Sequence, residues 1–283
     1  MTRKYTLFLL MLALFFLFRT PPASAWDIWT TSPWLALVTR FIGGVFVTVH
    51  PIEIWNDDGV SSRKIQTRSI PKTARIIALD TAEATRLGLN SKEWAELAVL
   101  YQSAPFDKKR SDFFFADPSA LPFIAQKIFT VLSRFDPGNY PYYQRRLAEF
   151  QTRLDSTVIV GRRLLSGATV FYIGGTFSGM LTAAGCSLLS VDETLGNAWE
   201  RGDELEKLQT LLVDALGKRA LVLVDISSSK KLKDTLRNNK DILFLGRPPL
   251  DQDLLLFFHD QYILLWNRLA ALRQTRSNTP SRK

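Results

Sequence analysis

Cysteine and histidine are scarce in this sequence of 283 residues, which contains one cysteine and two histidines. A single thiol excludes an internal disulfide, and a chain of this length can bury a core without one. Cys186 lies in the apolar stretch TAAGCSLLSV, which favours a buried structural thiol over a reactive one. The sequence also lacks a clustered Cys/His metal motif, a Gly-x-Ser-x-Gly motif and a partnered Cys–His pair, so we expect no enzyme activity.

Acidic residues are outnumbered, with 27 Asp and Glu against 36 Lys and Arg, which gives a formal net charge of +9. The densest basic runs, at 108–110, 230–231 and 282–283, are not interleaved with aromatic residues as a surface for single-stranded nucleic acid would be. We interpret these runs as solvated faces and a frayed tail. We therefore expect no nucleic-acid partner.

The longest uninterrupted apolar run lies at the start of the chain, from Leu7 to Phe18. Arg3 and Lys4 precede it, and the small residues Ala23–Ala25 follow, which is the pattern of a secretory signal peptide. As a helix the run rises only about 18 Å, short of the roughly 30 Å hydrocarbon core of a membrane, although an uncleaved anchor is the alternative. We expect cleavage after Ala25 and an exported, periplasmic protein.

One long amphipathic helix is predicted in the middle of the chain, from Tyr140 to Leu165. Asn139 is a capping residue, and Pro141 falls in the first turn, where a helix tolerates proline. The apolar stripe recurs every three or four residues, at Tyr143, Leu147, Phe150, Leu154 and Val158. At 1.5 Å per residue this helix is about 39 Å long, which favours a spine that joins two lobes.

Short β-rich runs alternate with helical stretches on both sides of this spine. The β-rich runs are 27–31, 45–50, 169–173, 187–191, 220–225 and 242–246, and the helical stretches are 35–44, 176–185, 199–217, 228–239 and 251–273. Such alternation indicates an α/β class with parallel sheets flanked by helices. We expect a signal peptide at 1–25, a first lobe at 26–138, a linking helix at 139–166, a second lobe at 167–274 and a disordered tail at 275–283. Ligands of such sheets bind at the carboxyl ends of the strands, here in a cleft between the lobes.

Four stretches of the sequence match one receptor family in order and in motif. The first stretch has an opening strand, a helix and a Gly-ended turn: TTSPWLALVTRFIGGVFVTVHP. The second begins near a Pro and ends with Gly-Leu followed by Glu-Trp: IPKTARIIALDTAEATRLGLNSKEWAEL. The third has an Asp-Pro helix, an Asp-Pro linker and a spine that starts with Tyr-Tyr, in FFFADPSALPFIAQKIFTVLSRFDPGNYPYYQRRLAEFQTRLD, and the fourth is a closing helix, FHDQYILLWNRLAALRQ. Over nearly all of 26–274 the chain resembles the zinc and manganese solute-binding proteins of bacterial ABC importers. The segment KTARIIALDTAEATRLG also resembles siderophore- and cobalamin-binding receptors, which share the architecture.

The resemblance implies a metal ion held by about four side chains, mostly histidines with one acidic residue, but these are largely replaced here. Phe113 stands where a histidine precedes the Asp-Pro pair, Gly174 stands where a ligand ends the first strand after the spine, and Arg247 stands at the acidic position. A ring and a glycine offer no side-chain lone pair, and a guanidinium has no acceptor. His50 and Asp57–Asp58 lie near the expected first turn, whose Asp-Pro-His motif is absent. A divalent ion is thus left open as a ligand, because the usual site is not recognisable.

Two further stretches are open to more than one interpretation. We predict that the Phe run of SDFFFADPSAL is a buried strand whose first ring, Phe113, faces the cleft, and that Asp117 caps a helix starting at Pro118. Gly174–Thr176 is interpreted as a tight turn, although with Arg247 opposite it could form an oxyanion pocket.

Two functions follow from these observations. The first is a monomeric solute-binding protein that delivers a small solute or metal ion to the membrane permease of an ABC importer. Asp225, which ends the strand ALVLVD, is the best-placed carboxylate for it in the second lobe. The ligand is then expected at the cleft residues His50, Asp58, Phe113, Gly174, Asp225 and Arg247. The second is a degenerate envelope protein of the same fold that acts as an accessory or interaction subunit, or binds an anionic or chelated ligand.

Overall fold

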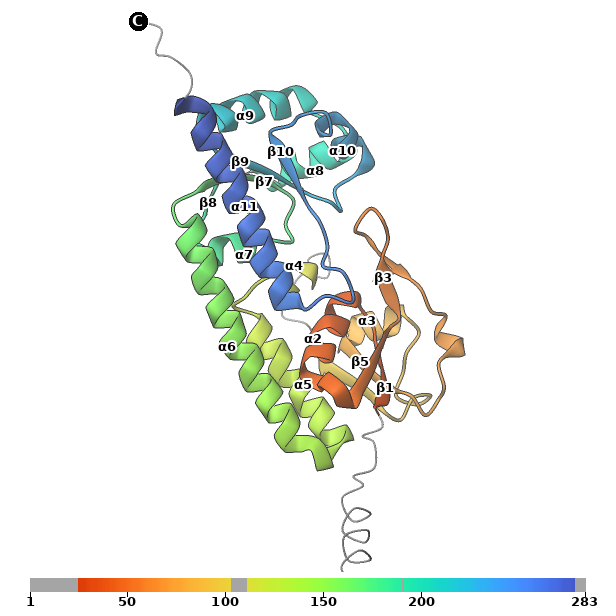
Figure 1. Ribbon diagram of the computed structural model, residues 1–283. Helices are drawn as coiled ribbons and strands as arrows, with labels where there is room; N and C mark the ends of the chain where they lie inside the picture. Colours follow the sequence, from red (N-terminus) through yellow and green to blue (C-terminus); the bar gives the residue numbers. More distant parts are fainter. Residues whose placement is uncertain (1–24, 103–110, 190, 278–283) are drawn as a thin grey trace, which may run out of the picture.

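Two parallel sheets, each flanked by helices, are joined along one side by a long helix (Figure 1). The computed structural model describes residues 25–102, 111–189 and 191–277. The first sheet has the order β2-β1-β5-β6 and consists of β1 (Trp26–Thr30), β2 (Val47–Pro51), β5 (Arg75–Asp80) and β6 (Leu97–Tyr101). The second has the order β10-β9-β7-β8 and consists of β7 (Thr169–Ile173), β8 (Ser187–Leu189), β9 (Leu221–Asp225) and β10 (Ile242–Leu245). Residues 1–24 of the signal peptide expected at 1–25, and residues 278–283 of the tail expected at 275–283, lie outside the described residues, whereas 275–277 of that tail are helical.

The helices follow the strands in the alternating order that the sequence predicts. The first lobe carries α2 (Pro33–Gly43), α3 (Thr81–Arg86), α4 (Ser111–Phe115) and α5 (Leu121–Phe135), and the spine is α6 (Tyr140–Leu165). The second lobe carries α7 (Ser178–Ala183), α8 (Glu193–Arg201), α9 (Leu205–Gly217) and α10 (Lys230–Leu236), and α11 (Leu254–Ser277) closes the chain. Within the described ranges, every helix is too short or too polar to be a candidate for a membrane span. The α/β class with two lobes and a linking helix is thus confirmed.

The spine α6 begins and ends at the residues that the hydrophobic periodicity predicts. Four side chains of its apolar stripe are buried: Tyr143, Leu147, Phe150 and Leu154. The stripe then turns slightly, because Thr157 is buried in place of Val158. Asn139 occupies the capping position, but its side chain donates to Asp136 Oδ2 at 2.8 Å instead of capping the helix.

One hydrophobic core runs through both lobes and along α6. The first sheet separates this shared core from a smaller, outer core of the first lobe. Alternate residues of β5 face the two cores, with Ile77 in the shared core and Ile76 in the outer one. The second sheet is divided in the same way, with Leu223 on the shared core and Val222 on an outer one. A core that continues across both lobes opposes wide hinge motion between them.

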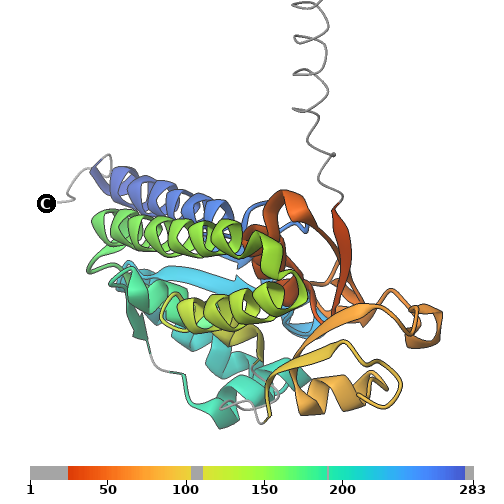
Figure 2. The same ribbon diagram turned by 90° about the horizontal axis from the view of Figure 1, so that it is seen from below.

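The closing helix α11 lies alongside the spine α6 (Figures 1 and 2). Gly161 of α6 allows this close approach, because a Cβ placed there would lie 2.6 Å from the ring of Tyr262. Arg153 on the spine pairs with Asp253 at 3.0 Å, just before α11 begins. The two helices therefore form a double rod that carries both lobes.

Two predicted elements differ in the structure. The Phe run forms the short helix α4 and not a strand, and Asp117 does not cap a helix at Pro118, because α5 begins only at Leu121. Asp117 instead accepts hydrogen bonds from the backbone and hydroxyl of Ser119. The single charged helix expected at 199–217 is two helices, α8 and α9, because Gly202 adopts a left-handed conformation with φ of 84° and ends the first.

A β-hairpin that the sequence did not predict projects from the first lobe toward the second (Figure 1). It consists of β3 (Glu53–Trp55) and β4 (Ser61–Arg63), and we call residues 56–60 between them the hairpin turn. Asn56 organises the turn, since its side-chain oxygen accepts from the backbone N–H groups of Asp58 and Val60. Gly59, with φ of 71°, lies against Ile226 of the second lobe, where a Cβ would approach Ile226 Cγ2 to 2.4 Å.

Candidate functional site

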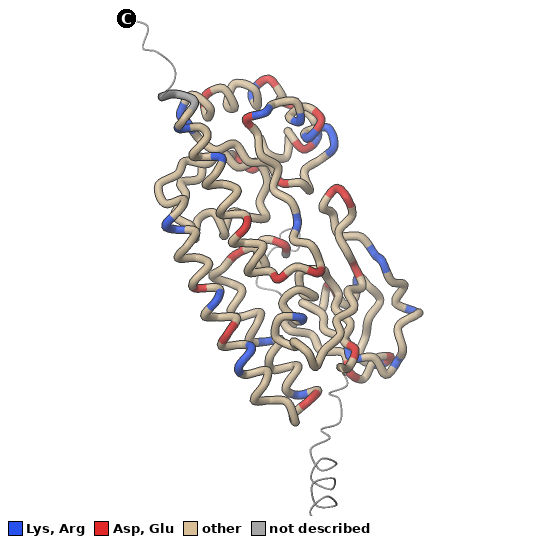
Figure 3. Tube along the Cα trace, in the orientation of Figure 1, with Lys and Arg blue, Asp and Glu red and all other residues tan. Residues whose placement is uncertain are grey.

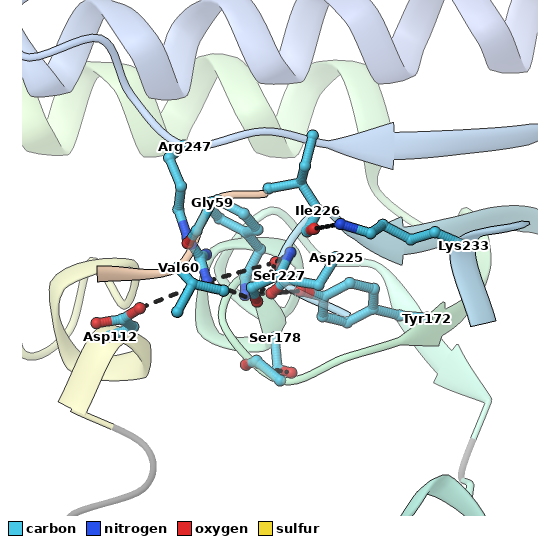
Figure 4. A network of polar contacts seen from close by, with 12 residues as sticks. Gly59, Val60, Asp112, Tyr172, Ser178, Asp225, Ile226, Ser227, Lys233 and Arg247 are labelled. Atoms are coloured by element: carbon cyan, nitrogen blue, oxygen red, sulfur yellow. Dashed lines mark hydrogen bonds and ion pairs between the residues drawn. The ribbon is translucent and has the colours of Figure 1, made fainter. Parts of the chain in front are cut away.

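Arg247 lies between the two lobes and binds to both of them (Figure 4). The residue follows β10, and its side chain is only 6 % exposed. Its Nε donates to Gly59 O in the hairpin turn at 3.1 Å, and its Nη2 donates to Ser227 Oγ at 2.8 Å. The same Nη2 lies 3.4 Å from Asp112 Oδ2 and 3.4 Å from Asp225 Oδ1. We call these five residues the arginine network.

Asp225, at the carboxyl end of β9, is the buried anion of this network, with a side chain 3 % exposed. Its Oδ1 accepts from the backbone N–H and the hydroxyl of Ser227 at 3.1 and 2.9 Å. Its Oδ2 accepts from Tyr172 OH at 3.2 Å, and that hydroxyl in turn accepts from the backbone N–H of Phe177. Gly174 packs beside it with φ of 133°, where a Cβ would lie 2.6 Å from Asp225 Cβ. The carboxylate is therefore fully engaged by this chain's own groups.

A second ion pair joins the lobes at the same hairpin turn. Lys233 on α10 is nearly buried, and its Nζ lies 2.7 Å from Asp58 Oδ1 and 2.9 Å from Ile226 O. This salt bridge lowers the pKa of Asp58, first through the hydrogen bond from Lys233 and then through its charge. The hairpin turn thus receives one cation from each of two segments of the second lobe.

Aromatic side chains from both lobes border the arginine network. The guanidinium carbon of Arg247 lies 5.8 Å from the ring centre of Phe177. The ring of Trp34 contacts Phe177 at 6.5 Å, Trp55 at 5.2 Å and Phe115 at 6.1 Å between centroids. Apolar rings exclude water, which strengthens the polar interactions beside them.

Two carboxylates face one guanidinium, so the network carries an excess of negative charge when all three groups are ionised. Burial raises the pKa of Asp112, and the charge of Arg247 opposes that rise only in part. Burial and the adjacent Asp225 raise the pKa of Tyr172, which keeps its hydroxyl protonated as a donor. An anionic ligand here would meet these carboxylates, so the arrangement disfavours the oxyanion pocket that Gly174–Thr176 suggested.

The candidate ligand residues fall into two groups in the structure. Asp225 and Arg247 belong to the arginine network, Gly174 packs beside it, and Asp58 forms the neighbouring ion pair. Phe113 and His50 take no part in these contacts. Phe113 lies on α4 with its ring against Phe114, and His50 pairs with Asp27 at 2.7 Å and packs on Trp29 at 4.9 Å. His259 lies on the closing helix α11, where its Nδ1 is 3.6 Å from Asp260 Oδ1.

Sequence reasoning missed four members of the site: Gly59, Asp112, Ser227 and Lys233. Asp112 had a signal, since it directly precedes Phe113, the position that the resemblance singled out. Ser227 is two residues beyond the strand that ends at Asp225, where strand-end polar groups gather. Gly59 belongs to the turn signal Asp58-Gly59, but neither it nor Lys233 could be assigned to the site, because a hairpin turn and a helix face meet only in three dimensions.

The residues of this site do not fit a divalent ion. Within the part of the chain that the structure describes, no group of three or more His, Cys, Asp or Glu side chains is arranged to hold a metal. The two carboxylates that could contribute already flank Arg247. A divalent ion about 4 Å from the guanidinium would be repelled by about 8 kcal/mol at an effective dielectric constant of about 20.

The fold matches solved structures of several proteins at low sequence identity. ZnuA matches with a TM-score of 0.64 and 17 % identity over 86 % of this chain and 99 % of its own. A zinc-bound deletion mutant of ZnuA matches with a TM-score of 0.64 and 16 % identity over 87 % of this chain and 98 % of its own. The laminin-binding protein Lmb of Streptococcus agalactiae, described as having adhesin and metal-transporting activity, matches with a TM-score of 0.66 and 13 % identity over 87 % and 100 %. No family model matches the chain, and no curated protein matches it in sequence. The resemblance to metal receptors is thus confirmed at the level of the fold.

Proposed function

We propose that this chain is an exported protein with the fold of an ABC-importer metal receptor that carries no divalent ion and acts as an accessory or interaction subunit in the envelope. The observation that supports this most is the position of Arg247, whose buried guanidinium lies between Asp112 and Asp225. The groups that could ligate a metal are held by a positive charge that belongs to the chain itself.

The contacts between the lobes support the same function. A receptor that loads and releases cargo has to exchange contacts across its cleft. Here Arg247 donates to Gly59 O, and Lys233 pairs with Asp58, so residues of the two lobes contact each other directly. Such direct contacts oppose separation of the lobes and support a protein that presents one shape to a partner. The fold makes a membrane permease of an importer the natural partner.

A second function, a receptor for a small solute other than a free metal ion, is favoured by unused donors near the network. Arg247 Nη1 and Trp55 Nε1 are buried, and neither has a hydrogen-bond partner among the described residues. Buried donors of this kind are usually paired, so an oxygen-bearing neutral solute could bind them. The membrane permease of an ABC importer would then receive that solute from this protein.

Metal binding by the purified protein tests the first function directly. Calorimetry with Zn²⁺, Mn²⁺ and Fe³⁺, together with metal analysis of the isolated protein, should show no stoichiometric binding. The zinc-bound ZnuA deletion mutant is the positive control, because it shares the fold. Stoichiometric binding of any of the three ions by the wild-type chain would refute the proposal.

The second function is tested by native mass spectrometry of protein isolated from its own compartment. A single co-purifying small molecule, lost from an Arg247→Lys variant, would favour a solute receptor. Protein of the bare chain mass, recovered with a permease partner after cross-linking, would favour the accessory subunit.

A further inference from the structure

Four oxygen atoms from three separate segments converge on the guanidinium of Arg247. Gly59 O comes from the hairpin turn, Asp112 Oδ2 comes from α4, and Asp225 Oδ1 and Ser227 Oγ come from the end of β9 and the turn that follows it. Figure 4 shows these groups around the end of the arginine side chain. Gly59 O and Ser227 Oγ accept hydrogen bonds from Arg247, and the two carboxylate oxygens form ion pairs with it. A set of carboxylate, carbonyl and hydroxyl oxygens is the chemistry of a site for a hard or planar cation.

We propose that this acceptor set is a cation-binding site whose permanent occupant is the chain's own guanidinium. The proposal rests on the proposed function and deepens it, since it assigns to Arg247 the bridging role of a bound ion. The side chain is only 6 % exposed, so the surrounding protein groups and not solvent hold its guanidinium. The occupant is tethered, so a free ion has to displace it before it can bind the same oxygens.

The backbone around the site is shaped to admit this cation. Gly59 has no Cβ, which lets the hairpin turn approach Ile226 and bring its carbonyl to Arg247 Nε. Gly174 has the same effect beside Asp225, where a Cβ would lie 2.6 Å from that residue's Cβ. Tyr172 and Ser227 then fix the orientation of the Asp225 carboxylate through donors of their own. An oriented carboxylate binds a planar guanidinium better than a freely rotating one does.

A tethered guanidinium competes with a free cation for the same oxygens, so a free cation should bind readily only when the guanidinium is removed. Arg247→Ala removes the guanidinium and leaves Asp112 and Asp225 facing an unfilled space. The proposal predicts that a free cation will then bind there and restore stability. N-methylguanidinium has the shape and charge of the missing group, and Mn²⁺ and Zn²⁺ test whether a spherical cation is accepted.

The experiment is thermal unfolding of Arg247→Ala with and without millimolar N-methylguanidinium, MnCl₂ or ZnCl₂. At a concentration several times its dissociation constant, a cation that binds should raise the Tm of this variant by about 2–4 °C. The same cations should not raise the Tm of the wild-type chain, and the neutral analogue N-methylurea should not raise the Tm of either. Stabilisation of Arg247→Ala by any of the three cations supports the proposal, and stabilisation by none of them overturns it.

Two control variants separate the site from general effects. Arg268→Ala also removes an arginine that binds a main-chain carbonyl and a carboxylate, those of Lys240 and Asp241, but lies outside the network. Its Tm should not respond to the cations. Arg247→Ala combined with Asp225→Asn should weaken the response, because the more buried of the two carboxylates has lost its charge. A response of undiminished size in the double variant would overturn the proposal.

A failure of Arg247→Ala to fold is also informative. Removing both charges of a buried pair is less costly than removing one, so the double variant should be more stable than Arg247→Ala alone. If neither variant folds under any of these conditions, Arg247 serves packing and not charge, and the cation site is overturned. The proposed function fails on a different result, namely metal binding by the wild-type chain.

Discussion

Lys233 and Asp58 are 175 residues apart in the sequence and form an ion pair in which Nζ lies 2.7 Å from Oδ1. The two partners differ in environment, since the lysine side chain is 8 % exposed and the aspartate side chain is 67 % exposed. Figure 3 shows acidic residues on the hairpin turn that projects toward the second lobe. The buried ammonium group of Lys233 therefore pairs with a carboxylate that is exposed to solvent on the hairpin turn.

Asp58→Asn should make the protein less stable at neutral pH. The folded pKa of Asp58 lies below its ordinary value of 3.8, mainly because of the hydrogen bond from Lys233. The pair therefore contributes stability that is complete above that value and is lost as the pH falls through the folded pKa. Tm measured by circular dichroism from about pH 7 to about pH 2.5 should show the variant and the wild type converging in acid. Asp57→Asn, one residue earlier in the same exposed turn, is the control, and an equal loss in both would exclude a role for the ion pair.

Glu83→Gln should have the opposite pH dependence. Burial raises the pKa of Glu83, and the bonds from Thr31 and Leu79 N–H reverse only part of this effect. The ionised carboxylate therefore costs stability above its ordinary pKa of 4.5, and the cost disappears as the carboxyl protonates in acid. A glutamine oxygen can accept the same two bonds, so the variant should gain a few tenths to about 1 kcal/mol near neutral pH. Urea unfolding at neutral and acidic pH measures this, with the exposed Glu96→Gln as control; a variant that is less stable at neutral pH contradicts the prediction.

Gly174→Ala should destabilise the protein by about 2–4 kcal/mol. The residue has φ of 133°, and its new Cβ would meet Asp225 Cβ at 2.6 Å. Both the backbone conformation and the space are therefore unsuitable for alanine. Gly175→Ala is a matched control, since a Cβ there has no neighbour within 4 Å, and it should change stability by less than about 0.5 kcal/mol. Equal effects in urea unfolding would show that the packing against Asp225 is unimportant.

Gly161→Ala and Gly196→Ala should change stability in opposite directions. Alanine normally stabilises a helix interior by about 0.5–1 kcal/mol relative to glycine, and Gly196 in α8 has open space for it. Gly161 in α6 does not, because the Cβ would lie 2.6 Å from the ring of Tyr262, so this variant should lose about 1–3 kcal/mol. Comparison of the two midpoints of urea unfolding measures the difference. A stabilised Gly161→Ala would mean that α11 can shift away from the spine at little cost.

The spine and six strands (β1, β2, β7, β8, β9 and β10) were predictable because their signals are local, whereas β5 and β6 were not among the predicted runs. The apolar spacing from Tyr143 to Leu154 and Pro141 in the first turn fixed α6 to the residue. The Phe run was predicted wrongly because consecutive aromatic residues show neither a helical nor a strand period. Gly202 was read as an interior helix residue, whereas its left-handed conformation separates α8 from α9.

The candidate site was predictable only in part. Strand-end position identified Asp225, and the resemblance pointed to Arg247, but the partners of Arg247 depend on tertiary contacts. Gly59 O is 188 residues away from it in sequence, and it lies on a hairpin that was not predicted although Asp58-Gly59 is a turn signal. An ion pair or a carbonyl contact over such a separation leaves no spacing rule to detect.

The segment that holds Arg247 lies near the end of the chain, so its contacts can form only after most of the chain has been synthesised. The first sheet has all its strands by Tyr101, whereas β10 and α11 occupy 242–277. Arg40 binds Leu250 O and Arg153 binds Asp253, so this last segment returns to partners from much earlier in the chain. Contacts of such sequence separation form late and slowly. A growing chain would thus keep one apolar side of its spine uncovered until the final helix is made, and premature termination before residue 254 would leave an aggregation-prone product and not a smaller working protein.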